Sequence, residues 1–427
     1  MKNNEVIVIG AGASGLVVAR ELSRAGVNVT IIEAHDRVGG RIHTIQDDEF
    51  TWPTELGAEF IHGNLKTTFK LLKEYKISYS SAKGQIWHVR KGELEKDKDF
   101  VADHHRLLEK ELKRLKRDMP LKKFLDTHFK GNEFFSMKQA VTGFVEGYES
   151  AEMERFSTFA FRKDWLDAED WDQYRVEGGY GKLMSALAGD CVKQGCRIIF
   201  SSPVRKIKWK KDFAQVMCEE KTFTANKAVV AVPLGVLQQN KISFSPALPE
   251  KIKASQTLGY GEVIKILFLF KTKFWENKTL QKKLEENLDK LFFLFSEASV
   301  PTWWTQYPSS TPLLTGWLSG SKAKKRMHNS EKEIFEEAMQ SLSFIFEESE
   351  SDLKAKLKAW KVVNWSKDEF SLGSYPYATV NAEKHIGKIF KPEKNTLFFS
   401  GEIFHEGGGT VEDALSAGFK TSEKILS

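Results

Sequence analysis

The sequence of 427 residues has little cysteine and no long apolar run. Its three cysteines, Cys191, Cys196 and Cys218, are too few for a disulfide framework and lack the spacing of metal ligands, so we expect no metal site. They are consistent with small core residues in a reducing compartment. No stretch of about 20 apolar residues is present, so no segment is expected to cross a membrane. Because the first predicted strand begins almost at Met1, we expect no signal peptide and predict a cytoplasmic protein.

Patterns typical of other function classes are also missing. We find no Ser/His/Asp or Cys/His arrangement for nucleophilic catalysis, and no internal repeat. The formal net charge is +6, and the densest basic stretch, EKELKRLKRDMPLKKFL (109–125), has leucines at helical spacing. No aromatic platform for stacking bases accompanies it, so we predict no nucleic-acid binding. We interpret this stretch as the solvated face of a helix, and contact with an anionic surface is the alternative.

The N-terminal stretch VIVIGAGASGLVVARELSRAGVNVTIIEAHDRVGGR (6–41) predicts a strand, a glycine-rich turn, a helix and a second strand. The runs 6–9 and 27–32 are typical of buried strands, and residues 14–25 have apolar residues at helical spacing. The glycines Gly10, Gly12 and Gly15 have the G-x-G-x-x-G spacing. In such a unit the first glycine permits a tight turn, the second lets the backbone approach a pyrophosphate, and the third lets the helix pack on the strand. This context predicts a dinucleotide site, and a glycine-rich turn of another α/β protein is the alternative.

Two features after the second strand select the dinucleotide. Glu33, 18 residues after Gly15, is placed to accept hydrogen bonds from an adenosine ribose and would repel the 2′-phosphate of NADP. In RVGGR (37–41), two glycines bring the backbone close to a ligand a second time, and Arg41 adds a permanent cation. Such a stretch is typical of flavoproteins of the glutathione-reductase type, so we predict FAD.

The chain is long enough for two domains, and its predicted elements return to each of them. Residues 76–175 are predicted to be largely helical, and residues 197–233 to be rich in strands. An alternating strand VIKILFLF (263–270) begins another sheet, and the last segment predicts a strand at 396–400 and a helix from about Val411. We therefore predict an α/β (α+β) fold with interleaved domains. The FAD-binding, Rossmann-like domain comprises 1–75, 176–258 and 380–427, and the substrate-binding domain, a mixed sheet plus helices, comprises 76–175 and 259–379.

Six segments, in order along nearly the whole chain, resemble those of the flavin-containing amine oxidases, the family of monoamine oxidases, polyamine oxidases and lysine-specific histone demethylases. After the glycine-rich unit they are ELGAEFIHG (55–63), EGGYGKL (177–183), VVAVPLGVL (229–237), GEVIKILFLF (261–270) and FSGEIF with GTVEDALSAG (399–404, 409–418). Within the family the likeness is sharpest to polyamine oxidases. The resemblance implies bound FAD and oxidation of an amine.

The resemblance also implies four catalytic residues. Lys265 is expected near flavin N5, held through a water, where it stabilises the negative charge that develops as O2 is reduced. His62 is expected to orient the substrate amine or to accept its proton. Glu149 corresponds to the carboxylate at the amine tunnel, and Tyr375 to an aromatic residue beside the flavin ring. Without the resemblance, alternation indicates a strand lysine with a solvated head at Lys265, and His62 would be a structural histidine.

Contacts to FAD are implied by the same resemblance. Ser374 stands where monoamine oxidases have the cysteine that binds FAD, so we expect no covalent link. Thr410 stands where they place the second tyrosine of an aromatic cage. The residues expected to contact FAD are Gly10, Gly12, Ala13, Ser14, Gly15, Glu33, Ala34, Arg37, Gly39, Gly40, Arg41, Gly57, Ala58, Glu59, Val204, Gly401, Glu402, Thr410 and Val411.

We predict a reaction of a small amine, O2 and water to an aldehyde or imine product and hydrogen peroxide, by hydride transfer to flavin N5. Acidic and aromatic residues alternate in DWLDAEDWDQY (164–174), which would attract a polyamine, and an exposed acidic loop is the alternative. An L-amino-acid oxidase of the same fold would need an arginine for the substrate carboxylate, such as Arg90 or Arg162. A desaturase would need an apolar pocket, a histone demethylase a long helical insertion, and an idle flavin-binding scaffold would lose Lys265.

Overall fold

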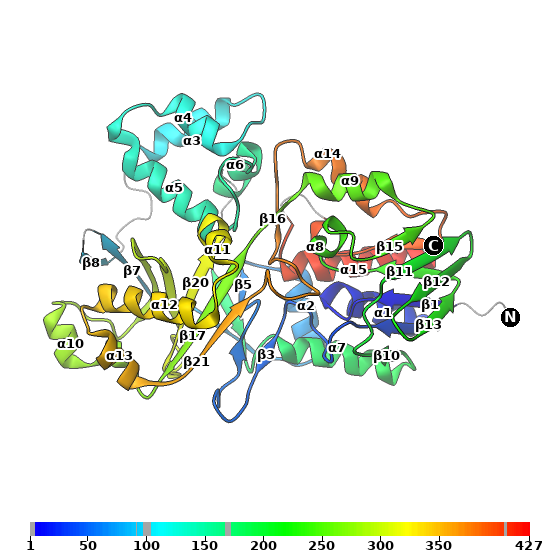
Figure 1. The fold of residues 1–427 in the computed structure, drawn as a ribbon, viewed down its shortest axis with the longest axis horizontal. Helices are drawn as coiled ribbons and strands as arrows, with labels where there is room; N and C mark the ends of the chain where they lie inside the picture. Colours follow the sequence, from blue (N-terminus) through cyan, green and yellow to red (C-terminus); the bar gives the residue numbers. More distant parts are fainter. Residues whose placement is uncertain (1–4, 91, 97–103, 167–171, 405–407) are drawn as a thin grey trace.

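The computed structural model describes residues 5–90, 92–96, 104–166, 172–404 and 408–427 (Figure 1). These residues form two parts. One part contains a five-stranded parallel sheet and lies on the right in Figure 1, and the other contains a seven-stranded sheet on the left, with a group of helices above it. The arrangement confirms the predicted α/β (α+β) fold.

The parallel sheet has the strand order β10-β2-β1-β14-β23, and each pair of neighbours is parallel. All four residues from Val6 to Ile9 are buried, because both faces of the sheet are covered. The predicted strands at 6–9, 27–32 and 396–400 and the predicted helix at 14–25 are confirmed to within one residue at each end. The five strands are β1 (Glu5–Ile9), β2 (Asn28–Ile32), β10 (Arg197–Ile199), β14 (Lys227–Val230) and β23 (Leu397–Phe399).

Alternation along β1 divides its side chains between two layers. Val6 and Val8 pack against helices α1 (Ala13–Arg24), α2 (Lys66–Glu74), α7 (Gly181–Lys193) and α15 (Val411–Leu426). Ile7 and Ile9 pack against a second sheet of β11 (Lys206–Lys210), β12 (Phe213–Met217), β13 (Thr222–Ala225) and β15 (Ser243–Ser245). Helices α8 (Leu234–Gln238), α9 (Pro249–Thr257) and α14 (Glu383–Phe390) complete this part. The carboxyl ends of β1 and β2 therefore meet at one edge, where a nucleotide binds in folds of this kind.

The seven-stranded sheet has the order β21-β17-β20-β19-β18-β7-β8, and only its β18–β7 pair is parallel. Helices α12 (Glu331–Phe346) and α13 (Glu350–Lys356) pack on it over a core that includes Trp275 and Trp303. The strands are β7 (Gln85–Arg90), β8 (Glu93–Lys96), β17 (Val263–Phe270), β18 (Leu291–Ser296), β19 (Thr302–Thr305), β20 (Leu313–Ser319) and β21 (Leu357–Asn364), with helices α10 (Lys278–Lys283) and α11 (Gly320–Arg326) beside them.

A group of helices with its own core lies above this sheet (Figure 1). It consists of α3 (His105–Arg114), α4 (Leu121–His128), α5 (Phe135–Gly147) and α6 (Thr158–Leu166). Short strands connect the parts: β3 (Thr44–Ile45) with β4 (Thr54–Glu55), β16 (Gly259–Tyr260) with β22 (Pro376–Tyr377), and β5 (Phe60–His62) with β9 (Gln173–Val176) and β6 (Tyr79–Ser81). Among the described residues, no helix is long and apolar enough to cross a membrane.

Two local predictions are wrong and one is only partly right. Strand β17 does not alternate between core and solvent: all eight of its residues are buried, because one core covers Ile266 and Phe268 and another covers Leu267 and Leu269. The stretch 109–125 is not one helix, since α3 ends at Arg114 and α4 begins after Pro120, which has no N–H to continue a helix. Residues 76–175 are helical only from α3 onward, and β6 to β8 precede it.

The predicted domain bounds stay a prediction. Strands β7 and β8 share a sheet with β17 to β21, as expected if 76–175 and 259–379 belong together. The small sheet β5-β9-β6, however, takes its strands from both sides of the bound predicted after residue 75.

Gly15 lets α1 lie directly on the turn that precedes it. A Cβ at this position would lie 2.0 Å from the carbonyl oxygen of Gly10, whose own φ of +104° suits glycine. The first turn of α1 would have to move away from β1 to admit a side chain.

We expect Gly15→Ala to lower the free energy of unfolding by about 1–3 kcal/mol, the usual cost of forcing a methyl group into a packed position. Gly189→Ala is the matched control, because Gly189 is exposed on α7 and a Cβ there meets nothing within 4 Å. That control should be neutral or up to about 1 kcal/mol more stable, since alanine is the better helix former. Urea unfolding of both variants measures the difference, and equal effects would contradict the close packing at Gly15.

Candidate active site

Two glycine-containing loops lie side by side at the edge where β1 and β2 end. Gly12 pairs with Gly39 through a backbone bridge, and the N–H of Gly39 donates to the carbonyl oxygen of Ala11 at 2.9 Å. A Cβ at Gly12 would meet nothing within 4 Å, and one at Gly40 would approach only the Cα of Gly12, at 3.7 Å. The space in front of these glycines is therefore open, as a pyrophosphate held by backbone N–H groups requires.

A serine pair connects this edge with the start of the C-terminal segment. The hydroxyl oxygens of Ser14 and Ser400 lie 2.6 Å apart, and a Cβ at Gly401 would meet nothing within 4 Å. Ala13, also predicted, is the first residue of α1 and is buried. The N-terminus of α1 and the segment around Gly401 thus lie next to each other.

Glu33 is buried against the glycine-rich turn. Its carboxylate accepts hydrogen bonds from the backbone N–H groups of Ala11, at 2.5 Å, and His35, at 2.9 Å. Ala34 follows it, half-buried. The carboxylate thus lies where the ribose of a dinucleotide is expected in this kind of unit.

Other predicted residues shape the loop that carries Arg41. The guanidinium of Arg37 donates to the carbonyl oxygen of Gly40 at 2.9 Å, and burial lowers the pKa of this arginine. A Cβ at Gly57 would lie 1.8 Å from the carbonyl oxygen of Arg41, which also accepts the N–H of Ala58 at 3.2 Å. These three residues therefore hold the backbone of the loop. Val204, also predicted to contact FAD, does not belong to this loop. It lies in the core between the two sheets of the first part.

Arg41 joins three segments that are distant in the sequence. Its guanidinium pairs with the carboxylate of Glu402 at 2.7 Å and donates to the carbonyl oxygen of Ser374. Burial opposes the charge on Arg41, but the carboxylate of Glu402 outweighs burial and raises the arginine pKa above its usual value. Ser374 is itself buried, and its hydroxyl donates to the carbonyl oxygen of Gly261 at 2.8 Å.

The N-terminus of α15 lies beside Tyr375. Thr410 caps this helix: its hydroxyl oxygen accepts the N–H of Asp413 at 3.1 Å, and the Asp413 carboxylate accepts the N–H of Thr410 at 3.2 Å. A Cβ at Gly409 would lie 3.6 Å from the Cβ of Tyr375, and Val411 begins the helix. Residues 405–407, between the predicted strand at 396–400 and this helix, lie outside the described residues.

The end of α5 carries Tyr148 and Glu149 to the same place. The hydroxyl of Tyr375 donates to the carbonyl oxygen of Tyr148 at 2.7 Å, and the ring of His62 lies 5.4 Å from the Tyr148 ring, edge-on. Strand β20 anchors the segment, because the indole N–H of Trp317 donates to the carbonyl oxygen of Gly147 at 2.9 Å.

His62 on β5 and Glu149 after α5 have pKa values far from their ordinary ones. Burial lowers the pKa of His62 to about 4, so its imidazole is neutral at pH 7. Burial, with a further contribution from the charge of Asp164 on α6, raises the pKa of Glu149 to about 8. The half-buried Glu149 is therefore mainly protonated at pH 7 until a cation approaches it.

Lys265 is fully buried in the middle of β17, with no exposed surface. Its ammonium donates to the carboxylate of Glu59 at 2.8 Å and to the carbonyl oxygen of Gly57 at 3.2 Å. The interpretation from alternation alone, a lysine with a solvated head, is therefore wrong.

Glu59 has more partners than the sequence indicates. Its second oxygen accepts from the guanidinium of Arg175 at 3.0 Å, the indole of Trp304 at 3.0 Å and the amide of Gln306 at 3.1 Å. The contact of Glu59 with FAD stays a prediction, and in the structure its carboxylate accepts from these donors. Arg175, Trp304 and Gln306 were not predicted from the sequence, because they belong to no recognisable motif. Only the structure shows that Arg175 on β9 is paired with Phe60 on β5.

A row of ring contacts connects the buried lysine with the end of α5. The rings of Trp304 and Phe60 lie 5.8 Å apart, those of Phe60 and His62 5.8 Å, and those of His62 and Tyr148 5.4 Å. Of the four predicted catalytic residues, Lys265, His62 and Tyr375 thus lie along one continuous path of contacts. Glu149, the fourth, follows Tyr148 in the chain. Burial raises the pKa of Tyr375, and the nearby Glu149 carboxylate raises it further.

Residues 13–426 match the family model described as flavin containing amine oxidoreductase. The chain belongs to this family. The match covers the loop of Gly39 and Gly40, the buried lysine and the C-terminal segment described above, and it begins directly after Gly12. The family is that of flavin-containing enzymes, so the open space at the glycine loops is the expected place of the flavin nucleotide in this amine oxidoreductase.

Curated relatives match over nearly the whole chain. Polyamine oxidase 4 of Oryza sativa subsp. japonica is 27% identical over 445 residues, which cover 98% of this chain and 88% of that protein. Lysine-specific histone demethylase 2 of Homo sapiens is 26% identical over 455 residues, covering 99% of this chain and 53% of the demethylase.

Solved structures show the same fold at lower identity. Wild-type putrescine oxidase bound to putrescine has a TM-score of 0.80 at 20% identity, with 99% of each chain covered. Cyclohexylamine oxidase from Brevibacterium oxydans IH-35A has a TM-score of 0.80 at 18% identity, covering 99% of this chain and 98% of that chain. These structures share the two-part fold of this amine oxidoreductase.

The arginines proposed for an L-amino-acid oxidase have other surroundings. Arg90 is exposed at the end of β7. Arg162 donates to the carbonyl oxygen of Leu115 at 3.0 Å and lies 4.3 Å from the centre of the Phe159 ring. Of the acidic stretch 164–174, residues 167–171 lie outside the described residues.

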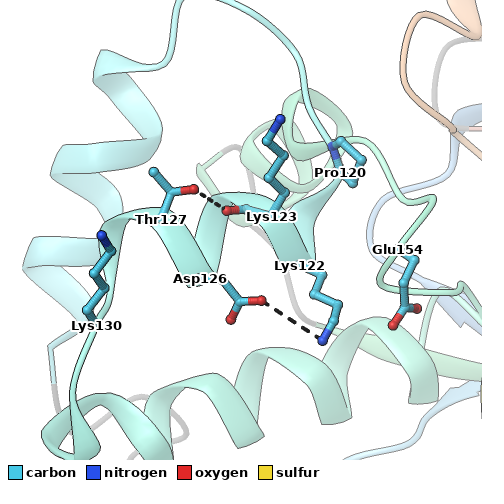
Figure 2. A pocket seen from close by; sticks show the side chains of 7 residues that line it. All are labelled: Pro120, Lys122, Lys123, Asp126, Thr127, Lys130 and Glu154. Atoms are coloured by element: carbon cyan, nitrogen blue, oxygen red, sulfur yellow. Dashed lines mark hydrogen bonds and ion pairs between the residues drawn. The ribbon is translucent and has the colours of Figure 1, made fainter.

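A hollow of about 550 Å³ on α4 is not part of the candidate active site (Figure 2). Figure 2 shows Lys122 paired with Asp126, at 3.9 Å, on the wall of this hollow. Its residues are Pro120, Lys122, Lys123, Asp126, Thr127, Lys130 and Glu154. Charges of both signs line it, and none of the predicted site residues does.

Substitution of Gly12, the N-cap of α1, separates flavin binding from folding. Asp and Asn are both favoured N-caps, so Gly12→Asp and Gly12→Asn should leave the unfolding free energy of the flavin-free chain within about 0.5 kcal/mol of wild type or raise it. Gly12→Asp should bind FAD at least about tenfold more weakly than Gly12→Asn, because like charges about 4 Å apart repel by about 4 kcal/mol near a protein surface. Fluorescence titration of flavin-free protein measures the affinities. Equal FAD affinity of the two variants would mean that no phosphate lies at Gly12.

Proposed function

We propose that this amine oxidoreductase oxidises polyamines or related small diamines with non-covalently bound FAD. The observation that carries the proposal is Glu149, a half-buried carboxyl that adjoins the Tyr148, Tyr375 and His62 contacts and interacts with the charge of Asp164. A substrate with a second ammonium group would pair with this carboxylate, whereas a monoamine would leave it without a cation. The names of the relatives, polyamine oxidase and putrescine oxidase, support the same substrate class.

The flavin would be held by backbone N–H groups at Gly12, by Glu33 at the ribose, and by the Arg41–Glu402 pair with the N-terminus of α15. When bound, it supplies the two-electron acceptor for hydride from the carbon next to the amine nitrogen. No covalent link is proposed, because Ser374 has a hydroxyl where a thioether would need a sulfur, and its hydroxyl is already bonded to Gly261.

Three side chains have assigned roles in the proposal. His62, neutral near pH 7, accepts a hydrogen bond from the substrate nitrogen and helps to keep its lone pair free of a proton. Tyr375 orients the substrate, with its hydroxyl fixed on the Tyr148 carbonyl oxygen. Lys265 places a positive charge where negative charge develops during O2 reduction.

The overall reaction follows from this arrangement. A secondary amine, O2 and water give an aldehyde, a shorter amine and hydrogen peroxide, and a primary amine gives ammonia in place of the shorter amine. A cytoplasmic location stays a prediction.

The test of the function is anaerobic titration of the purified protein with a panel of amines, followed by visible absorbance of the flavin. Spermine, spermidine, their acetylated forms and putrescine should bleach the flavin, and admission of O2 should restore the colour with release of peroxide. Bleaching by L-amino acids alone would identify an L-amino-acid oxidase instead. No bleaching by any amine would contradict the proposed function.

Glu149→Gln should change the pH dependence of diamine binding. Pairing with an ammonium requires the ionised carboxylate, so wild-type affinity for putrescine should rise as pH increases toward about 8, the Glu149 pKa. The amide cannot ionise, so this part of the pH dependence should disappear and binding at about pH 8 should weaken roughly tenfold, as expected for a hydrogen bond to a charged group. Cyclohexylamine, which has one nitrogen, is the matched control substrate. An equal loss for both amines would contradict a role of Glu149 in holding the second ammonium.

Lys265→Met should slow oxidation of the reduced enzyme by O2 far more than its reduction by amine. The methionine keeps the apolar stem and removes the charge that is proposed to stabilise the developing negative charge. Stopped-flow measurement of the two half-reactions separates the effects, and an unchanged reaction with O2 would remove Lys265 from the proposed function.

A further inference from the structure

Lys265 needs an anion because it lies in a strand that is covered on both faces. Burial of an ammonium without a partner costs several kcal/mol or forces the group to lose its proton. The carboxylate of Glu59, 2.8 Å away, meets this need, and Glu59 is itself buried. The pair joins the middle of β17 to the segment between β4 and β5.

The five residues Glu59, Lys265, Arg175, Trp304 and Gln306 form what we call the Glu59 cluster. One carboxylate oxygen accepts from Arg175, Trp304 and Gln306, and the other accepts from Lys265. Three donors on one oxygen prevent the carboxylate from rotating. The position of the other oxygen, and hence of the lysine nitrogen, is therefore determined by residues outside β17.

Arg175 is fixed as firmly as the carboxylate that it binds. Its guanidinium donates to the carbonyl oxygens of Thr305, at 2.9 Å, and Tyr307, at 3.0 Å, and lies 4.5 Å from the centre of the Phe60 ring. Two cations share the one ionised carboxylate of the cluster. Burial opposes ionisation of Glu59, but Lys265 and Arg175 outweigh burial and lower the pKa of its carboxyl to about 2. The cluster therefore keeps one unit of positive charge.

We propose that Glu59 and Arg175 are positioning residues of Lys265: Glu59 holds the ammonium in place, and Arg175 both holds Glu59 and restores the positive charge that Glu59 neutralises. The inference rests on the proposed function in placing Lys265 beside the flavin. Neither Glu59 nor Arg175 is required to touch the substrate.

The first experiment measures how well Lys265 is held. The purified protein is treated with acetic anhydride, and acetylation of single lysines is followed by mass spectrometry. In Glu59→Gln, acetic anhydride should acetylate Lys265 at least about tenfold faster than in wild type. The reason is that loss of one partner of a buried pair leaves an uncompensated charge. Lys251 is buried in the other part and donates to carbonyl oxygens in the last turn of α14. It is the internal control and should stay at its wild-type rate.

The second experiment measures the charge, through the midpoint potential of the bound flavin. Relative to wild type, Arg175→Met should lower the potential, Glu59→Gln should raise it, and the double variant should return toward the wild-type value, because it has the same net charge. Glu337→Gln on α12 is the matched control, because it removes the carboxylate partner of Arg326. It should change neither the midpoint potential of the flavin nor the acetylation rate of Lys265.

The outcomes decide the inference independently of the proposed function. Unchanged acetylation of Lys265 in Glu59→Gln, an equal rise at Lys251, or a shift of the potential in the same direction in both single variants would overturn it. If Glu59→Gln does not fold, Glu59→Asp keeps the charge but draws the carboxylate back, and the same rise in Lys265 acetylation is expected. A Lys265→Met variant that reacts normally with O2 would overturn the role of the lysine while leaving the acetylation and potential measurements to decide the cluster.

Discussion

The arrangement of this chain depends on the buried ammonium of Lys265, which has no solvent contact. A buried ammonium requires an anion beside it, and the anion is the carboxylate of Glu59, on the segment that also includes Leu56 and Gly57. The same segment touches the loop of Arg41, because Gly57 leaves no room for a Cβ beside the Arg41 carbonyl oxygen. The indole of Trp365, which follows β21, donates to the Leu56 carbonyl oxygen at 3.0 Å. One short segment therefore ties the parallel-sheet part to the seven-stranded sheet.

The candidate site lies at this junction, and its polar contacts reach across it. Arg41 comes from the first part, whereas Ser374, to which it donates, follows the strands of the second. Tyr375 in turn binds the end of a helix in the group above the sheet. Because each contact joins a different pair of segments, the geometry of the site depends on the packing of the parallel-sheet part, the seven-stranded sheet and the group of helices above that sheet.

Local sequence rules were sufficient for the elements around the glycine-rich turn. The strand–turn–helix–strand unit and the roles of Gly10 and Gly15 depend on residues close in the sequence, and these predictions agree with the structure to within one residue. The surroundings of Lys265 depend on contacts 116 residues away, for Arg175 with Glu59, and 245 residues away, for Trp304 with Glu59. No periodicity or spacing reports such contacts, which is why Arg175, Trp304 and Gln306 were missed. The alternating pattern assigned to β17 was wrong for the same reason, since the cover on its second face comes from distant elements.

The anchoring of the end of α5 has a consequence for how enzymes of this shape diversify. Trp317 and Ser319 of β20 fasten the backbone of Gly147 and Glu146, so the two residues that follow are set by the sheet and not by the helices beyond. The solvent-facing surfaces of α3 and α4 do not belong to the core of these helices and can accumulate changes without disturbing that attachment. Selection for a longer, bulkier or differently charged nitrogen compound can therefore act on these outer surfaces while the anchored end of α5 keeps its geometry.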